Sequence, residues 1–481
     1  MKRLLKWLGK CIAWGWRFIG FCRAAVGNLL LIAVAAAVLV LLFGDGSDKV
    51  PERAALVLAP SGMIVEQKTE FQWGRNLLDD EGPSETLLPD IIEAVDRASD
   101  DSRIQAIYLD LRKLQGAGLS KLQDIGAALK RFRESGKPII AWGDFYNQRN
   151  YYLAAHADRV YVNPLGGVLL TGLGIYQNYY RTALEKLRVQ FHVFRVGRYK
   201  SALEPVLRDE MSDFDREANS AVLSVLWSAY TSDVAALRSV DPKLLDDYIN
   251  NFPAHLASAG GQMGALALKH HLVDGLKTRD ELREELTRLV GEDQKYGTFN
   301  QVGLTDYVKA VRASSPAAEK EDKIGLIVAQ GMLLEGSQPA GKIGGDSLSA
   351  LIRQVRSDSR IRALVLRIDS PGGSAFASDQ IRRELELTRL SGLPVVISMS
   401  SVAASGGYWI ATAADEIWAS PTTLTGSIGI FSAFPTFEKA LDAIGIRNDG
   451  IGTIRLADAF NPYRPMNPLL ARSLEQLMQQ G

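Results

Sequence analysis

The chain has 481 residues, 47% hydrophobic and 23% charged, which is an ordinary globular composition in a chain too long for one core. Its 55 basic and 55 acidic residues balance, so the net charge gives no reason to expect a nucleic-acid partner. Both cysteines, Cys11 and Cys22, lie near the N-terminus, which excludes disulfides and Cys-based catalytic or metal sites from the remainder.

The N-terminal end has the pattern of a membrane anchor. Residues 1–23 carry basic side chains and no acid, and residues 24–43 are apolar apart from Gly27 and Asn28. About 20 such residues can cross a bilayer as a helix. Basic residues before the span and acids after it predict a single pass with a cytoplasmic N-terminus and the remainder outside, in the periplasm of a bacterium. A cleaved signal peptide is the alternative, although the apolar run is long for one and lacks a small-x-small cleavage site.

Beyond the span, strands alternate with helices. Strands are predicted at 54–58, 106–111 and 138–142, helices at 88–98 and 121–132, and the start of another helix at 151–156. This alternation is typical of an α/β layer with a mainly parallel sheet.

The same pattern then returns further along the chain. Three pairs of similar segments occur in one order, 256 or 257 residues apart: 101–106 with 358–363, 135–138 with 391–394, and 151–158 with 408–415. We therefore expect a tandem duplication of one α/β unit, with repeats at 54–312 and 323–481 joined by a polar linker at 313–322. The second repeat stops at Gly481, inside a predicted helix at 468–480, so we expect a C-terminally truncated chain.

The stretch 395–413 has the pattern of a nucleophile turn. A short apolar strand at 395–397 is followed by a small-residue turn at 400–407 and a helix that starts at Tyr408. A serine between a strand and a helix is exposed, and the free N–H groups of the helix start favour negative charge. Ser405 is the predicted nucleophile because two glycines follow it. A Ser/Gly-rich turn without chemistry remains the alternative, as do the nearby serines Ser398, Ser400 and Ser401.

Two further features distinguish the second repeat from the first. Its segment 369–374 reads Asp-Ser-Pro-Gly-Gly-Ser, whereas residues 112–118 of the first repeat lack the Pro-Gly-Gly. Adjacent glycines after a strand let backbone N–H groups point into a cleft, as an oxyanion hole requires. The first repeat has Gln148 or Arg149 at the position of Ser405, so the nucleophile belongs to the second repeat alone.

A serine nucleophile needs a base. All five histidines lie in the first repeat and none has a recognisable catalytic setting, so a Ser-His-Asp triad has little support. Lys200 is the alternative, because burial can lower the pKa of a lysine by several units. Its counterpart in the second repeat is Arg455, which stays protonated and cannot act as a base.

Taken together, the stretches 197–205, 369–374, 403–409 and 424–430 resemble the signal peptide peptidase family in its long, duplicated form. The resemblance implies a Clp protease/crotonase-like fold and a serine–lysine dyad at the boundary between the repeats. It implies that Ser405 attacks the scissile carbonyl, that Lys200 takes its proton and that the Ser427 hydroxyl orients Lys200. The N–H groups of Gly372, Gly373 and Gly406 are the implied candidates for the oxyanion hole.

The resemblance also implies a homotetramer on the outer face of the bacterial inner membrane. The implied function is that of a serine endopeptidase that degrades signal-peptide remnants and other apolar peptides, without cofactor or metal. Two rival interpretations stay open: a crotonase-type acyl-CoA hydratase or hydrolase, and a non-catalytic membrane scaffold.

Overall fold

The computed structural model describes residues 14, 16, 20, 23–38, 50–70, 83–314 and 322–480. It divides into two compact units, Met1–Val50 and Pro51–Gly481. Most of the predicted basic segment 1–23, residues 39–43 of the predicted anchor and residues 315–321 of the predicted linker lie outside the described residues.

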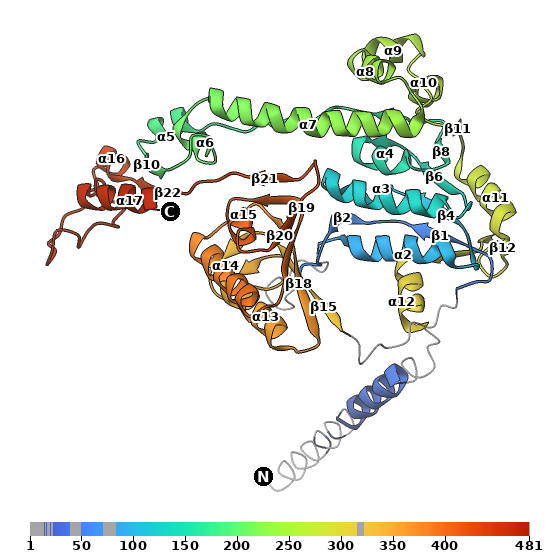
Figure 1. Ribbon diagram of the computed structural model, residues 1–481, viewed down its shortest axis with the longest axis horizontal. Coiled ribbons are helices and arrows are strands. Elements are labelled where there is room, and N and C mark those ends of the chain that lie inside the picture. The colour runs from blue at the N-terminus through green and yellow to red at the C-terminus, as the bar shows by residue number, and fades with distance from the viewer. Residues whose placement is uncertain are drawn as a thin grey trace, which may run out of the picture. The chain divides into compact units, whose positions relative to one another are not determined.

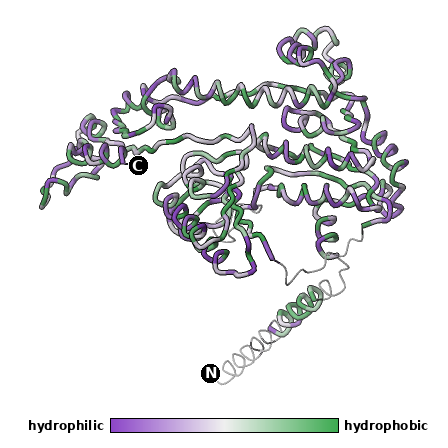
Figure 2. Tube along the Cα trace, viewed as in Figure 1, coloured by the Kyte–Doolittle hydropathy of each residue, from purple (hydrophilic) through white to green (hydrophobic). Residues whose placement is uncertain are grey.

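In the first unit, residues 23–38 form an apolar helix, which is mostly green in the hydropathy colouring of Figure 2. Its described length falls short of a full membrane span. Among the described residues, the helix that is long and apolar enough to cross a membrane is Asp213–Arg238, with 17% of its most apolar window buried. Asp233 in that helix accepts hydrogen bonds from Tyr152 and Gln123, so its C-terminal part packs against the rest of the second unit.

The first half of the second unit, residues 54–312, is built on a parallel sheet with the strand order β11-β8-β6-β4-β1-β14. Its central strands are nearly all apolar and buried, as expected when helices cover both faces of a parallel sheet. The strands are β1 (Ala54–Leu58), β4 (Ile104–Asp110), β6 (Ile139–Gly143), β8 (Arg159–Val162), β11 (Gly275–Leu276) and β14 (Gln301–Gly303). The helices around it are α2 (Leu88–Asp100), α3 (Leu119–Arg133), α4 (Gln148–Ala154), α11 (Arg279–Val290) and α12 (Leu304–Ser314).

The second half, residues 323–481, is built on another parallel sheet, with the order β15-β18-β19-β20 and β21 paired to β19. A separate cluster of buried apolar side chains forms the core of this half. The strands are β15 (Lys323–Gln330), β18 (Ile361–Ser370), β19 (Val395–Ala404), β20 (Glu416–Trp418) and β21 (Leu424–Gly426). Its helices are α13 (Gly345–Ser357), α14 (Ala375–Leu390) and α15 (Gly406–Ala411), which gather on one side of the sheet in Figure 1.

An antiparallel ribbon joins the two halves away from both sheets (Figure 1). It pairs β10 (Gln190–Arg195) of the first half with β22 (Phe431–Thr436) of the second half over their whole lengths. The long helix α7 (Asp213–Arg238) runs from this ribbon back to the first sheet in Figure 1. The helices near the ribbon are α5 (Arg181–Lys186), α6 (Glu204–Leu207), α16 (Glu438–Ala443) and α17 (Pro468–Gln480).

The remaining elements are short. The strands are β2 (Gly62–Val65), β3 (Glu85–Leu87), β5 (Leu114–Gly116), β7 (Tyr146–Asn147), β9 (Val168–Leu169), β12 (Glu292–Asp293), β13 (Thr298–Phe299), β16 (Leu333–Leu334) and β17 (Ile343–Gly344). The helices are α8 (Pro242–Asn250), α9 (Phe252–Ser258) and α10 (Met263–Lys269).

The predicted mixed α/β architecture with parallel sheets is confirmed, and three local predictions need correction. The small-residue turn predicted at 400–407 is mostly strand, because β19 continues to Ala404. Helix α15 begins at Gly406 and not at Tyr408. Residues 151–156 do not start a helix, because α4 begins at Gln148 and ends at Ala154.

Candidate active site

Ser405 lies between the end of β19 and the start of α15. Its backbone has φ 53° and ψ −118°, a conformation that a residue with a side chain seldom adopts and that marks strain at a functional turn. Its N–H donates to Gly426 O at 2.8 Å, and its carbonyl accepts from Trp409 N–H at 2.9 Å. Its hydroxyl does not cap α15, so the side chain is free to contact another group.

That other group is the side chain of Lys200, which belongs to the first half of the chain. Lys200 Nζ lies 2.9 Å from Ser405 Oγ. The same nitrogen donates to Ser427 O at 2.6 Å and lies 3.3 Å from Ser427 Oγ. The structure thus brings together the three residues to which the resemblance gave catalytic roles, with the Ser427 carbonyl closer to the amine than the predicted hydroxyl.

The ribbon β10–β22 explains how two residues so far apart in sequence meet. It continues past its last strand pair, because Val196 N–H donates to Ile430 O at 3.0 Å. Just beyond, the backbones touch: a Cβ on Gly429 would lie 2.3 Å from Val196 O, so only glycine fits there. The segment that carries Lys200 is therefore held against the segment that carries Ser427.

Lys200 is only 5% exposed. Burial lowers the pKa of its amine below the ordinary value of 10.5, because a buried cation loses hydration. Within the described part of the chain, no carboxylate forms an ion pair with Lys200 that would restore that pKa. The shift therefore raises the share of the neutral amine, which is the form that can accept a proton.

The predicted oxyanion glycines lie around Ser405. A Cβ on Gly406 would lie 3.3 Å from the Gly373 nitrogen, so these two N–H groups are neighbours. A Cβ on Gly372 would lie 2.7 Å from both the Gly406 nitrogen and Ser405 Cβ. The Gly372 N–H donates to Ser370 Oγ at 3.2 Å, which leaves Gly373 and Gly406 as the better-placed donors.

A cavity of about 350 Å³ opens beside Ser405. Apolar and small residues from both sides of the turn line it: Gly373, Ala375, Gly406, Tyr408, Trp409, Thr412, Ile428, Gly429 and Ile430. Such a lining suits an apolar side chain next to a reactive hydroxyl.

The alternative residues are placed elsewhere. Ser398 accepts from Arg367, the buried Ser400 hydrogen-bonds to Glu66, and Ser401 contacts Ser120 at 2.9 Å. No histidine hydrogen-bonds to Ser405 among the residues that the structure describes. His156 is largely buried, and this burial lowers its pKa to about 4. Neither the alternative serines nor the histidines form a contact between a nucleophile and a base like that of Ser405 with Lys200.

Comparison with known proteins gives the family. The chain matches the family described as Peptidase family S49 over residues 131–292 and 388–481, which is more than half of its length. It is 38% identical to "Protease 4" of Salmonella typhi, over 100% of this chain and 77% of that protein. It is 28% identical to "Serine protease SPPA, chloroplastic" of Arabidopsis thaliana, over 91% of this chain and 62% of that protein.

The chain therefore belongs to peptidase family S49, and it is a serine-type peptidase. The predicted membership of the signal peptide peptidase family is confirmed. The assignment favours a peptidase over the acyl-CoA enzyme and the inert scaffold that the sequence left open. The match to a solved membrane-bound stomatin-specific protease (1510-N) covers 49% of this chain and 86% of that chain, at 12% identity and a TM-score of 0.27.

Proposed function

We propose that this protein is a serine endopeptidase that uses a dyad of Ser405 and Lys200. The observation that carries the proposal is the distance of 2.9 Å between Lys200 Nζ and Ser405 Oγ, in a buried setting that lowers the lysine pKa. Lysine as a base needs both features, namely contact with the hydroxyl and a neutral amine at the working pH.

In this mechanism Ser405 Oγ attacks the carbonyl carbon of the scissile peptide while its proton moves to Lys200 Nζ. The N–H groups of Gly373 and Gly406 donate to the oxyanion that forms. The C–N bond then breaks, and the protonated amine of Lys200 returns the proton to the leaving amine. Water next attacks the acyl ester and gives a proton to Lys200. The ester C–O bond then breaks, Lys200 returns the proton to Ser405 Oγ, and the acid is released.

The Ser427 carbonyl and hydroxyl keep the amine in place through the cycle. The carbonyl accepts a hydrogen bond from Nζ at 2.6 Å. This bond fixes one N–H of the amine and thereby orients its other N–H and its lone pair. Ser427 has a positive φ of 50° beside Gly426 at 77°, so a strained turn presents its carbonyl.

We further propose that apolar peptides such as signal-peptide remnants are the substrates. The apolar lining of the cavity beside Ser405 supports this class. The apolar helix at 23–38 supports an N-terminal anchor that would keep the peptidase at the outer face of a bacterial inner membrane, with the N-terminus in the cytoplasm. The proposal of a homotetramer rests on the family resemblance alone.

We also propose that the two halves are repeats of one unit. Strand order supports this: β1, β4, β6 and β8 are neighbours in the first sheet, and β15, β18, β19 and β20 follow the same order in the second. The paired segments 151–158 and 408–415 run from the short helices α4 and α15, respectively, toward the next strand of each sheet.

A serine-directed acylating reagent tests the dyad. The wild-type protein should be labelled once, and Ser405→Ala should not be labelled. Lys200→Ala and Lys200→Arg should both be labelled very slowly, because neither side chain can take the serine proton. Labelling that persists in Ser405→Ala would overturn the proposal and direct attention to Ser398, Ser400 or Ser401.

A further inference from the structure

The strand that leads to Ser405 has a bulge. From the pair Ile368–Met399 to the pair Ser370–Ala403, β18 advances by two residues while β19 advances by four. Ser400, Ser401 and Val402 thus lie opposite Asp369 alone. Bulges of this kind often occur beside active sites, where they redirect a strand. This one ends three residues before the nucleophile.

Asp369 fills the gap that the bulge leaves in the sheet. One of its carboxylate oxygens, Oδ1, accepts from Val402 N–H at 3.1 Å, replacing a missing ladder hydrogen bond. Its other oxygen, Oδ2, lies 2.6 Å from the amine of Lys121. Lys121 comes from α3, in the first half of the chain. One carboxylate therefore connects the nucleophile strand, the start of the glycine loop at 371–373 and the opposite half.

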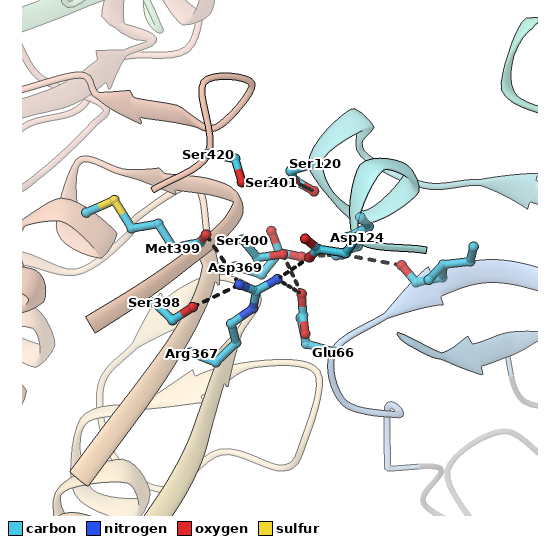
Figure 3. A network of polar contacts seen from close by, with 12 residues as sticks. Glu66, Ser120, Asp124, Arg367, Asp369, Ser398, Met399, Ser400, Ser401 and Ser420 are labelled. Atoms are coloured by element: carbon cyan, nitrogen blue, oxygen red, sulfur yellow. Dashed lines mark hydrogen bonds and ion pairs between the residues drawn. The ribbon is translucent and has the colours of Figure 1, made fainter. Parts of the chain in front are cut away.

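The first half contacts both serines of the bulge (Figure 3). Ser401 Oγ lies 2.9 Å from Ser120 Oγ, and Ser400 hydrogen-bonds to Glu66. A Cβ on Gly118 would lie 2.1 Å from Ser401 Oγ, so the start of α3 approaches as closely as glycine permits. The bulge is thus packed between the halves.

In the charge network around the bulge, Lys121 has a single carboxylate partner among the described residues. Arg367 donates to Glu66 at 2.9 Å and to Asp124 at 3.2 Å, which balances those carboxylates. Within the described chain, Asp369 is the carboxylate that pairs with Lys121, which is 5% exposed. The remaining Lys121 contact is with Ile64 O at 3.3 Å. A buried ion pair of this kind is costly to break from one side, because the other charge stays behind unpaired.

We propose that Lys121 is a positioning residue for the peptidase reaction. Through Asp369 it holds the bulge at 400–402 and the loop at 371–373 in register, so that the Gly373 and Gly406 N–H groups face the carbonyl attacked by Ser405. Lys121 acts through Asp369 and touches no reacting atom. This inference rests on the proposed function, because it concerns the geometry of the same site.

Lys121→Met tests the inference, with a fluorogenic acyl ester as the probe. The oxyanion donors act mainly on the transition state, so kcat should fall by about ten- to a hundredfold while KM changes less than about threefold. Lys121→Arg should recover most of the lost kcat, because it restores the cation. Lys277→Met is the matched control: it breaks the ion pair with Glu285 after β11, and it should leave kcat unchanged.

A double variant, Lys121→Met with Asp369→Asn, separates positioning from stability. It leaves no unpaired charge, so the melting temperature should return toward that of the wild type. Positioning predicts that kcat stays low, because the connection between the halves is still missing. If Lys121→Met alone fails to fold, kcat of the double variant still tests the inference.

Two results would overturn the inference: wild-type kcat in folded Lys121→Met, or a kcat that recovers together with the melting temperature in the double variant. Failure of the proposed function looks different, because Ser405→Ala would then hydrolyse the ester as fast as the wild type.

Discussion

The starts of helices α4 and α15 occupy corresponding places in the two halves, yet a side chain caps the first N–H groups of α4 and not those of α15. Asn147 caps α4, and its side chain accepts from the N–H groups of Arg149 and Asn150 at 3.0 and 3.1 Å. Ser405 is the N-cap residue of α15 but its side chain does not cap the helix, and its hydroxyl contacts Lys200 instead. A side chain thus caps the helix start in the first half, whereas the helix start in the second half has no side-chain cap.

The strands before these two helices also differ, because their pairing is regular in the first half and irregular in the second. Strands β4 and β6 pair in unbroken register from Ile107–Ile139 to Asp110–Trp142. Strands β18 and β19 slip at Asp369, and the first half packs against the slipped residues. The comparison teaches that the turn at Ser405 is one part of a larger irregular region, whereas the first half pairs its strands before α4 without such a shift.

The largest expected effect comes from pH, which tests whether the lysine is the base. If Lys200 is the base, its reactive form is the neutral one, and burial lowers its pKa below 10.5. Below that lowered pKa, the neutral fraction and hence kcat/KM should fall about tenfold per pH unit. Lys200→Arg should show almost no activity at any pH. A wild-type profile that is flat between mildly acidic and alkaline pH would contradict a lysine base.

A smaller effect is expected from Gly372→Ala, which tests the glycine loop that the first half lacks. The new Cβ would lie 2.7 Å from the Gly406 nitrogen, and Gly372 has φ 101°, which disfavours a side chain. Displacing the Gly406 donor should lower kcat by about a hundredfold. Gly392→Ala is the control, because Gly392 also has a positive φ but a Cβ added there would meet no atom within 4 Å. Equal losses in both variants would indicate backbone strain alone.

The smallest expected effect on catalysis comes from Asn147→Ala, which removes the cap that distinguishes α4 from α15. Uncapping α4 should lower the free energy of unfolding by about 1 kcal/mol and leave kcat unchanged. Thermal unfolding and ester hydrolysis measure the two effects separately. A marked fall in kcat would show that the first helix start contributes to the reaction after all.

Sequence patterns predicted the elements that depend on local chemistry. Strand 54–58 and helix 468–480 match β1 and α17 residue by residue, because apolar runs and helical spacing are local properties. The turn predicted at 400–407 was wrong, because small residues such as Ser and Ala usually indicate a turn, whereas here contacts with the first half keep them in a strand.

For the site, the residue types predicted the chemistry but not the support around it. The predictions of Ser405 and Lys200 rest on how similar segments in the two halves differ. Arg367 within an apolar strand and Lys121 within the buried face of α3 were visible signals of a buried charge network. Their partners lie more than 240 residues away, at Glu66 and Asp369, and no local pattern identifies such partners.

The ribbon β10–β22 has a consequence for when the protein becomes reactive. Its two strands are separated by about half of the chain, and the amine and hydroxyl that it helps to bring together are 205 positions apart. If Lys200 is the base, a nascent polypeptide cannot hydrolyse anything until β22 has been synthesised and folded back onto β10. On that mechanism the chain is synthesised as a latent enzyme, which becomes active only when the ribbon has formed.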